Sequence, residues 1–159
     1  MRFLKVCLSI AAALISLTLF QAAASAENTR SARVHWVIDG DTFEIEGGER
    51  VRLIGIDSPE YEPWKNYVQF YGKEAAEYAK SLLTGKTVLL EEDVEKKDRY
   101  GRTLAYVYLE DGQFVNLLLV QNGSARAKYY RPNIRRETVL KNAERIACAQ
   151  KKGLWSKSS

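Results

Sequence analysis

The sequence predicts an α+β fold in which a small five-stranded β-barrel is accompanied by three α-helices. Five short segments rich in β-branched and aromatic residues lie before and among three segments whose apolar residues recur at helical spacing. When such a small sheet closes into a barrel, its two edge strands pair with each other. The 159 residues are 46% hydrophobic and 28% charged, values typical of one globular domain rather than of a disordered chain.

The predicted strands are short and bounded by turn residues. Gly47-Gly48 joins the second and third as a tight hairpin, and Asp111-Gly112 forms a turn after the fifth. Residues 57–70 are expected to form a loop that opens at Ser58-Pro59. The five strands are predicted at Ala32–Ile38, Thr42–Glu46, Arg50–Ile56, Lys86–Val94 and Thr103–Glu110.

Three helices are predicted, each followed directly by a glycine that ends it. They span Tyr71–Thr84, Phe114–Asn122 and Ile134–Lys152. In the last helix Cys148 is expected to be a small buried hydrophobe, and Leu154-Trp155 is expected to fold back onto the core. The inward face of that helix is predicted to hold Val139, Leu140, Ala143, Ile146 and Ala147.

The N-terminal residues have the pattern of an export signal. Two basic residues precede the apolar run Val6–Phe20, and Ala24-Ser25-Ala26 then supplies the small residues that a signal peptidase accepts. We predict a signal peptide at residues 1–26, with cleavage after Ala26. The domain at residues 27–159 is then secreted or periplasmic and has no contact with a membrane. An uncleaved membrane anchor is the alternative.

The composition excludes several classes of catalytic site. The single histidine, His35, lies in a predicted strand and is expected to be an ordinary strand residue; it cannot form a site that needs several histidines. The motifs of serine hydrolases, of phosphate-binding loops and of dinucleotide-binding folds are absent from the sequence. Signal cleavage leaves Cys148 without a partner cysteine, so no internal disulfide is expected. Any catalysis must therefore use carboxylates, cations and, where one is bound, a metal ion.

Acidic residues are concentrated where the predicted strands end. Asp39-Gly40-Asp41-Thr42 follows the first strand and Asp57-Ser58-Pro59-Glu60 follows the third, in which Arg52 is the only charged residue of the run Val51–Ile56. Taken separately, the first motif also suits a turn and the second a helix cap. Taken together, they bring several acids near one point, where mutual repulsion requires a cation. Oxygen ligands favour Ca²⁺ or Mg²⁺.

Two further clusters are basic. Asp98-Arg99-Tyr100-Gly101-Arg102 places two arginines around an aromatic ring, with a solvated charged loop as the alternative. Further on, basic residues alternate with tyrosines in a way that suits phosphate neutralisation and base stacking, with a solvated helix start as the alternative. The residues of this second stretch are Arg126, Lys128, Tyr129, Tyr130, Arg131, Arg135 and Arg136.

The order and spacing of these motifs resemble the thermonuclease (staphylococcal or micrococcal nuclease) family. Three motifs in sequence carry the resemblance, namely Ile38–Thr42, Arg52–Glu60 and Asp98–Arg102. The likeness extends over essentially all of residues 27–159. Shorter agreements are Tyr71-Gly72, Val115-Asn116, Tyr130-Arg131-Pro132 and Leu154-Trp155-Ser156.

The resemblance implies an OB-fold, a five-stranded Greek-key barrel with three helices. It also implies a Ca²⁺-dependent phosphodiesterase that acts on DNA and RNA with little sequence preference and leaves 3′-phosphate ends. In such an enzyme Asp41, Asp57 and the backbone carbonyl of Ser58 match the metal ligands, and Asp39 matches an outer-shell acid.

The resemblance also assigns roles in catalysis and substrate binding. Glu60 matches the general base, and Arg52 and Arg102 match the two catalytic arginines. The residues that match the pocket for the terminal phosphate and base are Arg99, Tyr100 and Tyr130.

The sequence departs from the family in three places, the first of which is Ser58 where family members have a threonine. Lys128 stands where the best-known members have a stacking tyrosine, which predicts a phosphate contact instead. A segment that is lysine-rich in those members here holds four aromatic residues. They are expected either to stack on single-stranded bases or to pack into a small core of their own. The four residues are Tyr61, Trp64, Tyr67 and Phe70.

We therefore expect a monomer that acts on DNA and RNA, preferably single-stranded or denatured, with Ca²⁺ as cofactor and Mg²⁺ as an alternative. One rival function is a non-catalytic OB-fold module that binds single-stranded nucleic acid. The many acids count against it, since they hinder binding to a polyanion. The other rival is an exported OB domain that binds oligosaccharide or protein.

Overall fold

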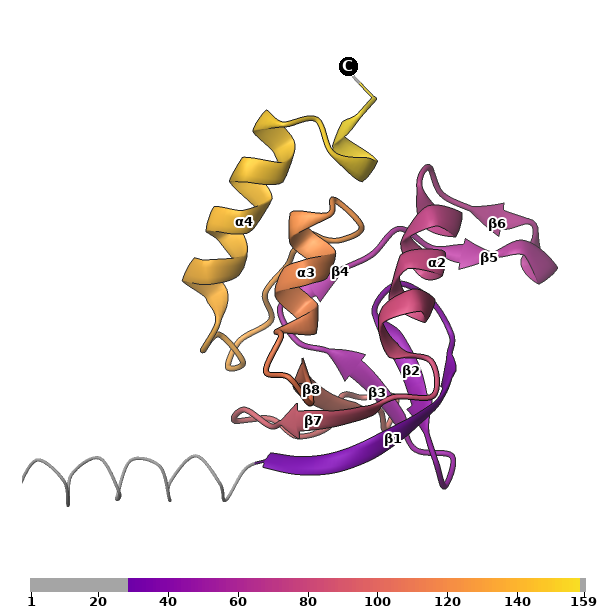
Figure 1. Ribbon diagram of the computed structural model, residues 1–159, viewed down its shortest axis with the longest axis vertical. Coiled ribbons are helices and arrows are strands. Elements are labelled where there is room, and N and C mark those ends of the chain that lie inside the picture. Colours follow the sequence, from indigo (N-terminus) through magenta and orange to yellow (C-terminus); the bar gives the residue numbers. More distant parts are fainter. Residues whose placement is uncertain (1–28, 158–159) are drawn as a thin grey trace, which may run out of the picture.

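The computed structural model describes residues 29–157, in which five strands close into a barrel (Figure 1). These strands are β1 (Thr29–Val37), β2 (Thr42–Ile45), β3 (Arg50–Leu53), β7 (Thr87–Glu91) and β8 (Thr103–Leu109). They follow the order β1-β2-β3-β8-β7, with β3 and β8 parallel and the other neighbours antiparallel. The α+β barrel predicted from the sequence is confirmed. The predicted signal peptide at residues 1–26 lies outside the described residues.

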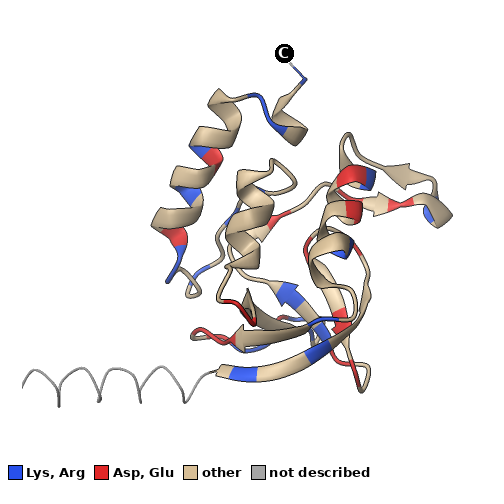
Figure 2. Cartoon of the chain, viewed as in Figure 1, with Lys and Arg blue, Asp and Glu red and all other residues tan. Residues whose placement is uncertain are grey.

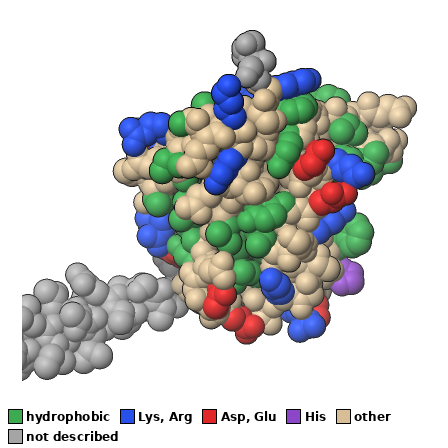
Figure 3. Space-filling view, turned by 45° about the horizontal axis from the view of Figure 1, so that its top comes forward, with side chains coloured by type: hydrophobic (Ala, Val, Ile, Leu, Met, Phe, Trp, Pro, Cys, Tyr) green, Lys and Arg blue, Asp and Glu red, His purple; other side chains and the backbone are tan. Residues whose placement is uncertain are grey.

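Alternation along the strands fills the barrel with apolar side chains. Ala105 and Val107 of β8 are fully buried and share one core with Phe43 of β2 and Val51 of β3. Burial of a side chain as large as Phe43 stabilises the fold by roughly 1.5–3 kcal/mol before chain entropy is counted. His35 lies on the outer face of β1 and is exposed, as expected of an ordinary strand residue (Figure 3).

The described residues also form the three α-helices α2 (Gly72–Leu83), α3 (Val115–Gln121) and α4 (Glu137–Ala149). Figure 1 shows α3 between α2 and α4, on one side of the barrel. The chain returns to this layer in the 3₁₀ helix η2 (Gly153–Trp155), where the N–H of the buried Leu154 donates to the Gly123 carbonyl at 2.9 Å. The predicted return of this segment to the core is confirmed. Within residues 29–157 no helix has the length and apolar character needed to cross a membrane.

Helix α4 differs from its prediction in extent and in its buried face. It is shorter than the predicted 134–152, and only Leu140, Ala143 and Ala147 are buried. Cys148 is exposed, so its assignment as a buried hydrophobe was wrong. Val139 and Ile146 were also expected inward but are 42% and 53% exposed. The reason is that α4 packs mainly on α3, a single neighbouring helix that covers one narrow stripe of its surface.

The segment predicted as a loop at residues 57–70 contains local structure. The two-residue strand β4 (Ile56–Asp57) pairs with β9 (Arg126–Ala127), and β5 (Tyr61–Glu62) pairs with β6 (Tyr67–Val68) around the 3₁₀ helix η1 (Pro63–Lys65). The β5–β6 hairpin projects from the molecule beside α2 (Figure 1). Its aromatic residues do not form a core of their own, because Trp64, Tyr67 and Phe70 are 67%, 48% and 46% exposed.

Glu91, at the end of β7, ties the segment that precedes α4 to the barrel. Its carboxylate accepts hydrogen bonds from Arg135 Nη1 at 2.8 Å, from Arg136 Nη2 at 2.9 Å and from the Tyr108 hydroxyl at 2.8 Å. Burial raises the pKa of Glu91, but these hydrogen bonds outweigh it and hold the pKa below its usual 4.5. A carboxylate with a depressed pKa stabilises the fold above its unfolded-state pKa, and this stabilisation is lost as the pH falls.

Glu91→Gln is therefore expected to lower the free energy of unfolding at neutral pH by about 2 kcal/mol. The difference from wild type should shrink as the pH falls below about 4.5, because the unfolded wild-type chain then takes up a proton at Glu91 and the stabilisation from its depressed folded-state pKa is progressively lost. Urea denaturation at several pH values measures this, with Glu110→Gln as a control at an exposed site. A difference that persists unchanged at about pH 3 would contradict the explanation.

Candidate active site

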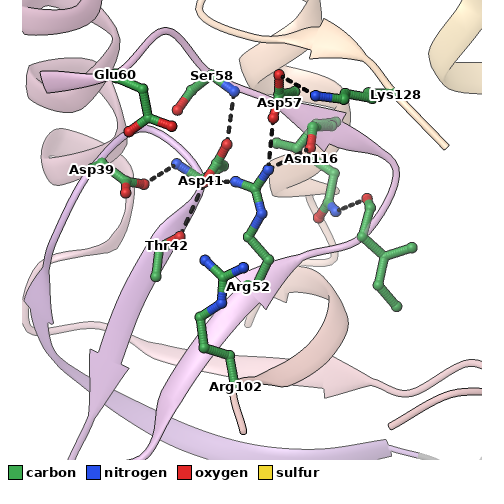
Figure 4. A network of polar contacts seen from close by, with 12 residues as sticks. Asp39, Asp41, Thr42, Arg52, Asp57, Ser58, Glu60, Arg102, Asn116 and Lys128 are labelled. Carbon is green, nitrogen blue, oxygen red and sulfur yellow. Dashed lines mark hydrogen bonds and ion pairs between the residues drawn. The ribbon is translucent and has the colours of Figure 1, made fainter. Parts of the chain in front are cut away.

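Arg52 of β3 is the centre of a polar cluster at one end of the barrel (Figure 4). Its Nη1 contacts Asp41 Oδ1, and its Nη2 lies 3.0 Å from Asp57 Oδ1. The guanidinium is mostly buried, with 14% of the side chain exposed. Because one guanidinium contacts both carboxylates, acids from two separate turns lie within a few ångströms of each other. The structure thus brings Arg52 together with two of the acids that the sequence placed at strand ends.

Local hydrogen bonds fix the two acidic turns against each other. The Asp41 N–H donates to Asp39 Oδ1 at 2.9 Å, and Asp41 Oδ2 accepts the Ser58 N–H at 2.7 Å. A side chain at Gly40 would not fit, since its Cβ would lie 2.6 Å from the Cβ of Ser58. Glycine at position 40 therefore permits the close approach of the turns.

Glu60 is held at the edge of this cluster by its backbone. Its N–H donates to Gln69 Oε1 at 3.0 Å, and its carbonyl accepts the Gln69 N–H at 2.9 Å. Helix α2 begins directly against that carbonyl, and a Cβ at Gly72 would lie 2.3 Å from it. The Glu60 side chain remains exposed and lies on the same side of Asp41 as Asp39 does (Figure 4).

The cluster holds more negative than positive charge. Burial raises the pKa of Asp39 despite the attraction of Arg52, and burial together with repulsion from Asp39 raises the pKa of Glu60. Burial likewise lowers the pKa of Arg52. Four carboxylates, those of Asp39, Asp41, Asp57 and Glu60, thus surround one buried guanidinium. A further cation would relieve their repulsion.

The donors suit a hard divalent cation, because all of them are oxygens. Asp41, Asp57 and the Ser58 carbonyl could bind such an ion, with Asp39 behind them. Residues 29–157 contain no preformed group of three or more Asp, Glu, His or Cys side chains arranged around a metal position. The guanidinium of Arg52 lies between Asp41 and Asp57 instead.

Arg102, the second predicted arginine, lies close to Arg52 (Figure 4). Asp98 holds it there by accepting hydrogen bonds from Arg102 Nε at 2.7 Å and from the Arg102 N–H at 3.0 Å. Although burial opposes the effect, the hydrogen bonds from Arg102 and from the Tyr100 N–H keep the pKa of Asp98 below its usual range. Asp98 is therefore charged at neutral pH and orients Arg102.

Two pockets beside the cluster share Arg102 and Tyr100 in their linings. The first, of about 700 Å³, contains three of the four predicted substrate residues: Arg99, Tyr100 and Tyr130. The second, of about 790 Å³, contains the fourth, Lys128. Other walls of the first pocket are Arg52, Ile54, Leu104 and Asn133. Other walls of the second are Asp57, Ser58, Glu60, Tyr67 and Gln69.

Lys128 reaches the acidic cluster through the pairing of β9 with β4. Its Nζ lies 3.0 Å from Asp57 Oδ2 and 5.6 Å from the centre of the Tyr130 ring. The rest of the basic stretch does not gather here, since Arg135 and Arg136 pair with Glu91 instead. Figure 2 likewise shows acidic and basic residues intermixed along α4 rather than a uniformly basic face. Electrostatic attraction to a polyanion must therefore arise locally, at the pockets.

Comparison with known proteins identifies the family to which this chain belongs. The family model described as staphylococcal nuclease homologue matches residues 50–157, more than half of the chain. The chain belongs to the staphylococcal nuclease homologue family. It is 44% identical over 132 residues to the thermonuclease of Staphylococcus hyicus, covering 81% of this chain and 78% of that protein. It is 46% identical over 124 residues to the thermonuclease of Staphylococcus intermedius, covering 76% and 73%. Endonuclease YncB of Bacillus subtilis is 39% identical over 126 residues, covering 76% and 59%.

Three residues of this staphylococcal nuclease homologue support the site but were not among the predicted site residues. Asp98 orients Arg102, and its position four residues before that arginine is a signal the sequence contains. Asn116 is fully buried; its amide donates to the Ile54 carbonyl at 2.8 Å and accepts the Val107 N–H at 3.0 Å, which fixes the end of β3 (Figure 4). Tyr67 was recognised as an aromatic of the loop, but its place in the second pocket depends on the hairpin.

Proposed function

We propose that this family member is an exported nuclease that uses Ca²⁺ to hydrolyse DNA and RNA with little sequence preference. Its relatives are thermonucleases and endonucleases, which makes the chain a nuclease, that is, a hydrolase of phosphodiester bonds. The contact of one buried arginine, Arg52, with both Asp41 and Asp57 is the observation that carries the assignment of the site. Mg²⁺ is the alternative metal, and the protein acts as a monomer that leaves 3′-phosphate ends.

Arg52 and Arg102 are proposed to bind the phosphate that is cleaved. Arg102 lines both pockets and Arg52 lines the first, and the two side chains lie close together (Figure 4), so a strand bound there can pass from one pocket to the other. Each planar fork donates to non-bridging oxygens and stays charged at every relevant pH, so it stabilises the negative charge that develops there. Asp98 keeps Arg102 in that orientation.

Glu60 is proposed as the general base that takes a proton from the attacking water. Its carboxylate is exposed at the second pocket, and its raised pKa makes it a better proton acceptor than an ordinary surface glutamate. When bound at Asp41, Asp57 and the Ser58 carbonyl, Ca²⁺ supplies charge neutralisation of a phosphate oxygen. Asp39 fixes the turn that carries Asp41 and acts as the outer-shell acid.

The substrate strand is proposed to lie across both pockets. Arg99, Tyr100 and Tyr130 hold the terminal phosphate and base in the first pocket, and Lys128 contacts a phosphate beside the second. Tyr100 and Tyr130 are 69% and 63% exposed, so part of each ring is accessible to unpaired bases. This supports a preference for single-stranded or denatured substrates.

Digestion of denatured DNA with and without metal tests the proposal. We expect degradation in Ca²⁺, a loss of roughly 10²-fold when the metal is chelated, and products with 3′-phosphate and 5′-hydroxyl ends. Gel-shift measurements on the same samples separate cleavage from binding. Retention of DNA without cleavage in Ca²⁺ would favour a binding module, and neither cleavage nor retention would reject nucleic acid as the ligand.

A further inference from the structure

We propose that Tyr67 is the stacking platform of a second nucleoside subsite, which binds the base across the scissile phosphate from the one in the Tyr130 pocket. The inference rests on the proposed function, because it takes Arg52 and Arg102 as the phosphate site. It goes further in assigning a specific role to the β5–β6 hairpin and in predicting how the two nucleosides are arranged.

The relation of the two pockets requires a second nucleoside site. Tyr100 and Arg102 line both pockets, so the pockets meet at the position proposed for the phosphate. A strand whose phosphate lies there must continue in two directions. One neighbouring nucleoside enters the pocket of Tyr130 and Leu104, and the other enters the pocket of Glu60 and Tyr67.

The ring of Tyr67 is held in a defined place within the second pocket. Its hydroxyl accepts a hydrogen bond from Gln69 Nε2 at 2.8 Å, and Gln69 Oε1 accepts the Glu60 N–H at 3.0 Å. Two hydrogen bonds thus connect the ring to the backbone of the proposed general base. The ring is 48% exposed, which leaves a face available to a ligand.

The charges around the pocket favour a base rather than another phosphate as the group bound by Tyr67. Of the three cations that line this pocket, Arg102 and Lys128 are already assigned to phosphates, and Lys65 Nζ lies 2.7 Å from Glu62 Oε1, so it already has an acidic partner. Glu60 adds a further negative charge. An aromatic ring binds a base of any sequence by stacking, which agrees with little sequence preference.

The exposed apolar surface of the hairpin continues this platform. Trp64 and Val68 are 67% and 51% exposed on the same hairpin as Tyr67. Hydrophobic side chains gather at the edge of the molecule where Figure 1 places the hairpin (Figure 3). We assign this apolar surface of the hairpin, which continues from the second pocket, to contact with further bases of the same strand.

The arrangement excludes continuous base stacking at the cleavage point. The two pockets have only Tyr100 and Arg102 in common among their lining residues, so bases held one in each pocket are not expected to stack on each other. The two nucleosides that flank the scissile phosphate must therefore be splayed apart, which a paired duplex resists.

The test removes the base and the ring separately and together. The full protein in Ca²⁺ receives single-stranded oligonucleotides with one cleavable linkage, whose base on one flank or on the other is replaced by an abasic residue. On the flank whose base binds Tyr67, we expect loss of the base to lower kcat/KM about tenfold in wild type but less than twofold in Tyr67→Ala. Loss of the base on the other flank should affect both proteins equally.

Two variants and a second measurement complete the test. Tyr67→Phe keeps the ring but loses the hydrogen bond from Gln69, so it is expected to retain most of the base dependence that Tyr67→Ala loses. Trp36→Ala removes an exposed aromatic of β1 outside both pockets. A binding measurement that does not depend on cleavage uses 2-aminopurine on the flank that binds Tyr67. Its fluorescence should be quenched on binding to wild type but not on binding to Tyr67→Ala. Equal base dependence in wild type and Tyr67→Ala on both flanks, or a loss in Tyr67→Phe as large as in Tyr67→Ala, overturns the proposal. If quenching is observed but no strand is cleaved, the result counts against the proposed nuclease function and not against the Tyr67 subsite.

Discussion

Arg52→Ala is expected to lower kcat/KM for denatured DNA by roughly 10³-fold, because Arg52 is proposed to stabilise charge that develops on the phosphate. A single lost hydrogen-bond donor of this kind costs about 10²–10³ in rate, and Arg52 presents two terminal nitrogens to its partners. The substitution also leaves Asp41, Asp57 and Asp39 without their shared counter-charge. Steady-state kinetics of wild type and variant, both saturated with Ca²⁺, measure the effect.

Arg52→Lys separates the loss of charge from the loss of geometry. Lysine keeps the positive charge but cannot bridge two carboxylates or two phosphate oxygens with one planar group. We therefore expect this variant to stay folded by circular dichroism yet to remain at least about 10²-fold below wild type. Near wild-type activity in Arg52→Lys would show that the residue supplies only charge, and full activity in Arg52→Ala would remove the proposed mechanism.

The acidic site could be predicted from the sequence because each part of it is local. Asp41, Arg52 and Asp57 all come from the short stretch of chain between residues 39 and 60, and β2 pairs with β3 so that Thr42 lies opposite Arg52. Strand ends that are close in sequence must then be close in space. The common contact with Arg52 follows from this hairpin, even though the sequence cannot give its distances.

The errors have a physical cause as well. The spacing of Val139, Ile146 and Cys148 correctly indicates a helix, but periodicity does not say how much of the helix its neighbours cover. Because α4 packs mainly on α3, these three residues stay exposed. The hairpin at residues 61–68 escaped prediction for a different reason, since strands of two residues are too short to show alternation.

The pockets could not be predicted because they depend on tertiary packing. Tyr67 and Tyr100 are separated by more than thirty residues and belong to different units of the fold, yet they line the same pocket. The sequence predicts Tyr67 as a candidate for stacking and, through the family resemblance, Tyr100 as a pocket residue, but it does not indicate that they share a site. That Arg102 and Tyr100 line two pockets at once is a property of the folded chain alone.

Glu60→Gln is expected to lower kcat by roughly 10²–10⁴-fold with little change in KM, because glutamine keeps the shape of the side chain but cannot accept the proton. The backbone groups of Glu60 that bind Gln69 are unchanged, so the turn and the hairpin should keep their positions. Substrate affinity should hold or increase, since a negative charge facing Asp39 has been removed. Single-turnover kinetics separate this chemical step from binding.

Glu62→Gln is the matched control for Glu60→Gln. Glu62 lines the same pocket and carries the same charge, but its carboxylate lies 2.7 Å from Lys65 Nζ and is already committed to that ion pair. If Glu60 acts by accepting a proton, Glu62→Gln should change kcat less than about threefold, as expected for an exposed ion pair worth less than ~1 kcal/mol. Equal losses in the two variants would mean that the charge of the pocket matters and not the base. A kcat for Glu60→Gln within tenfold of wild type would move the general-base role to another group.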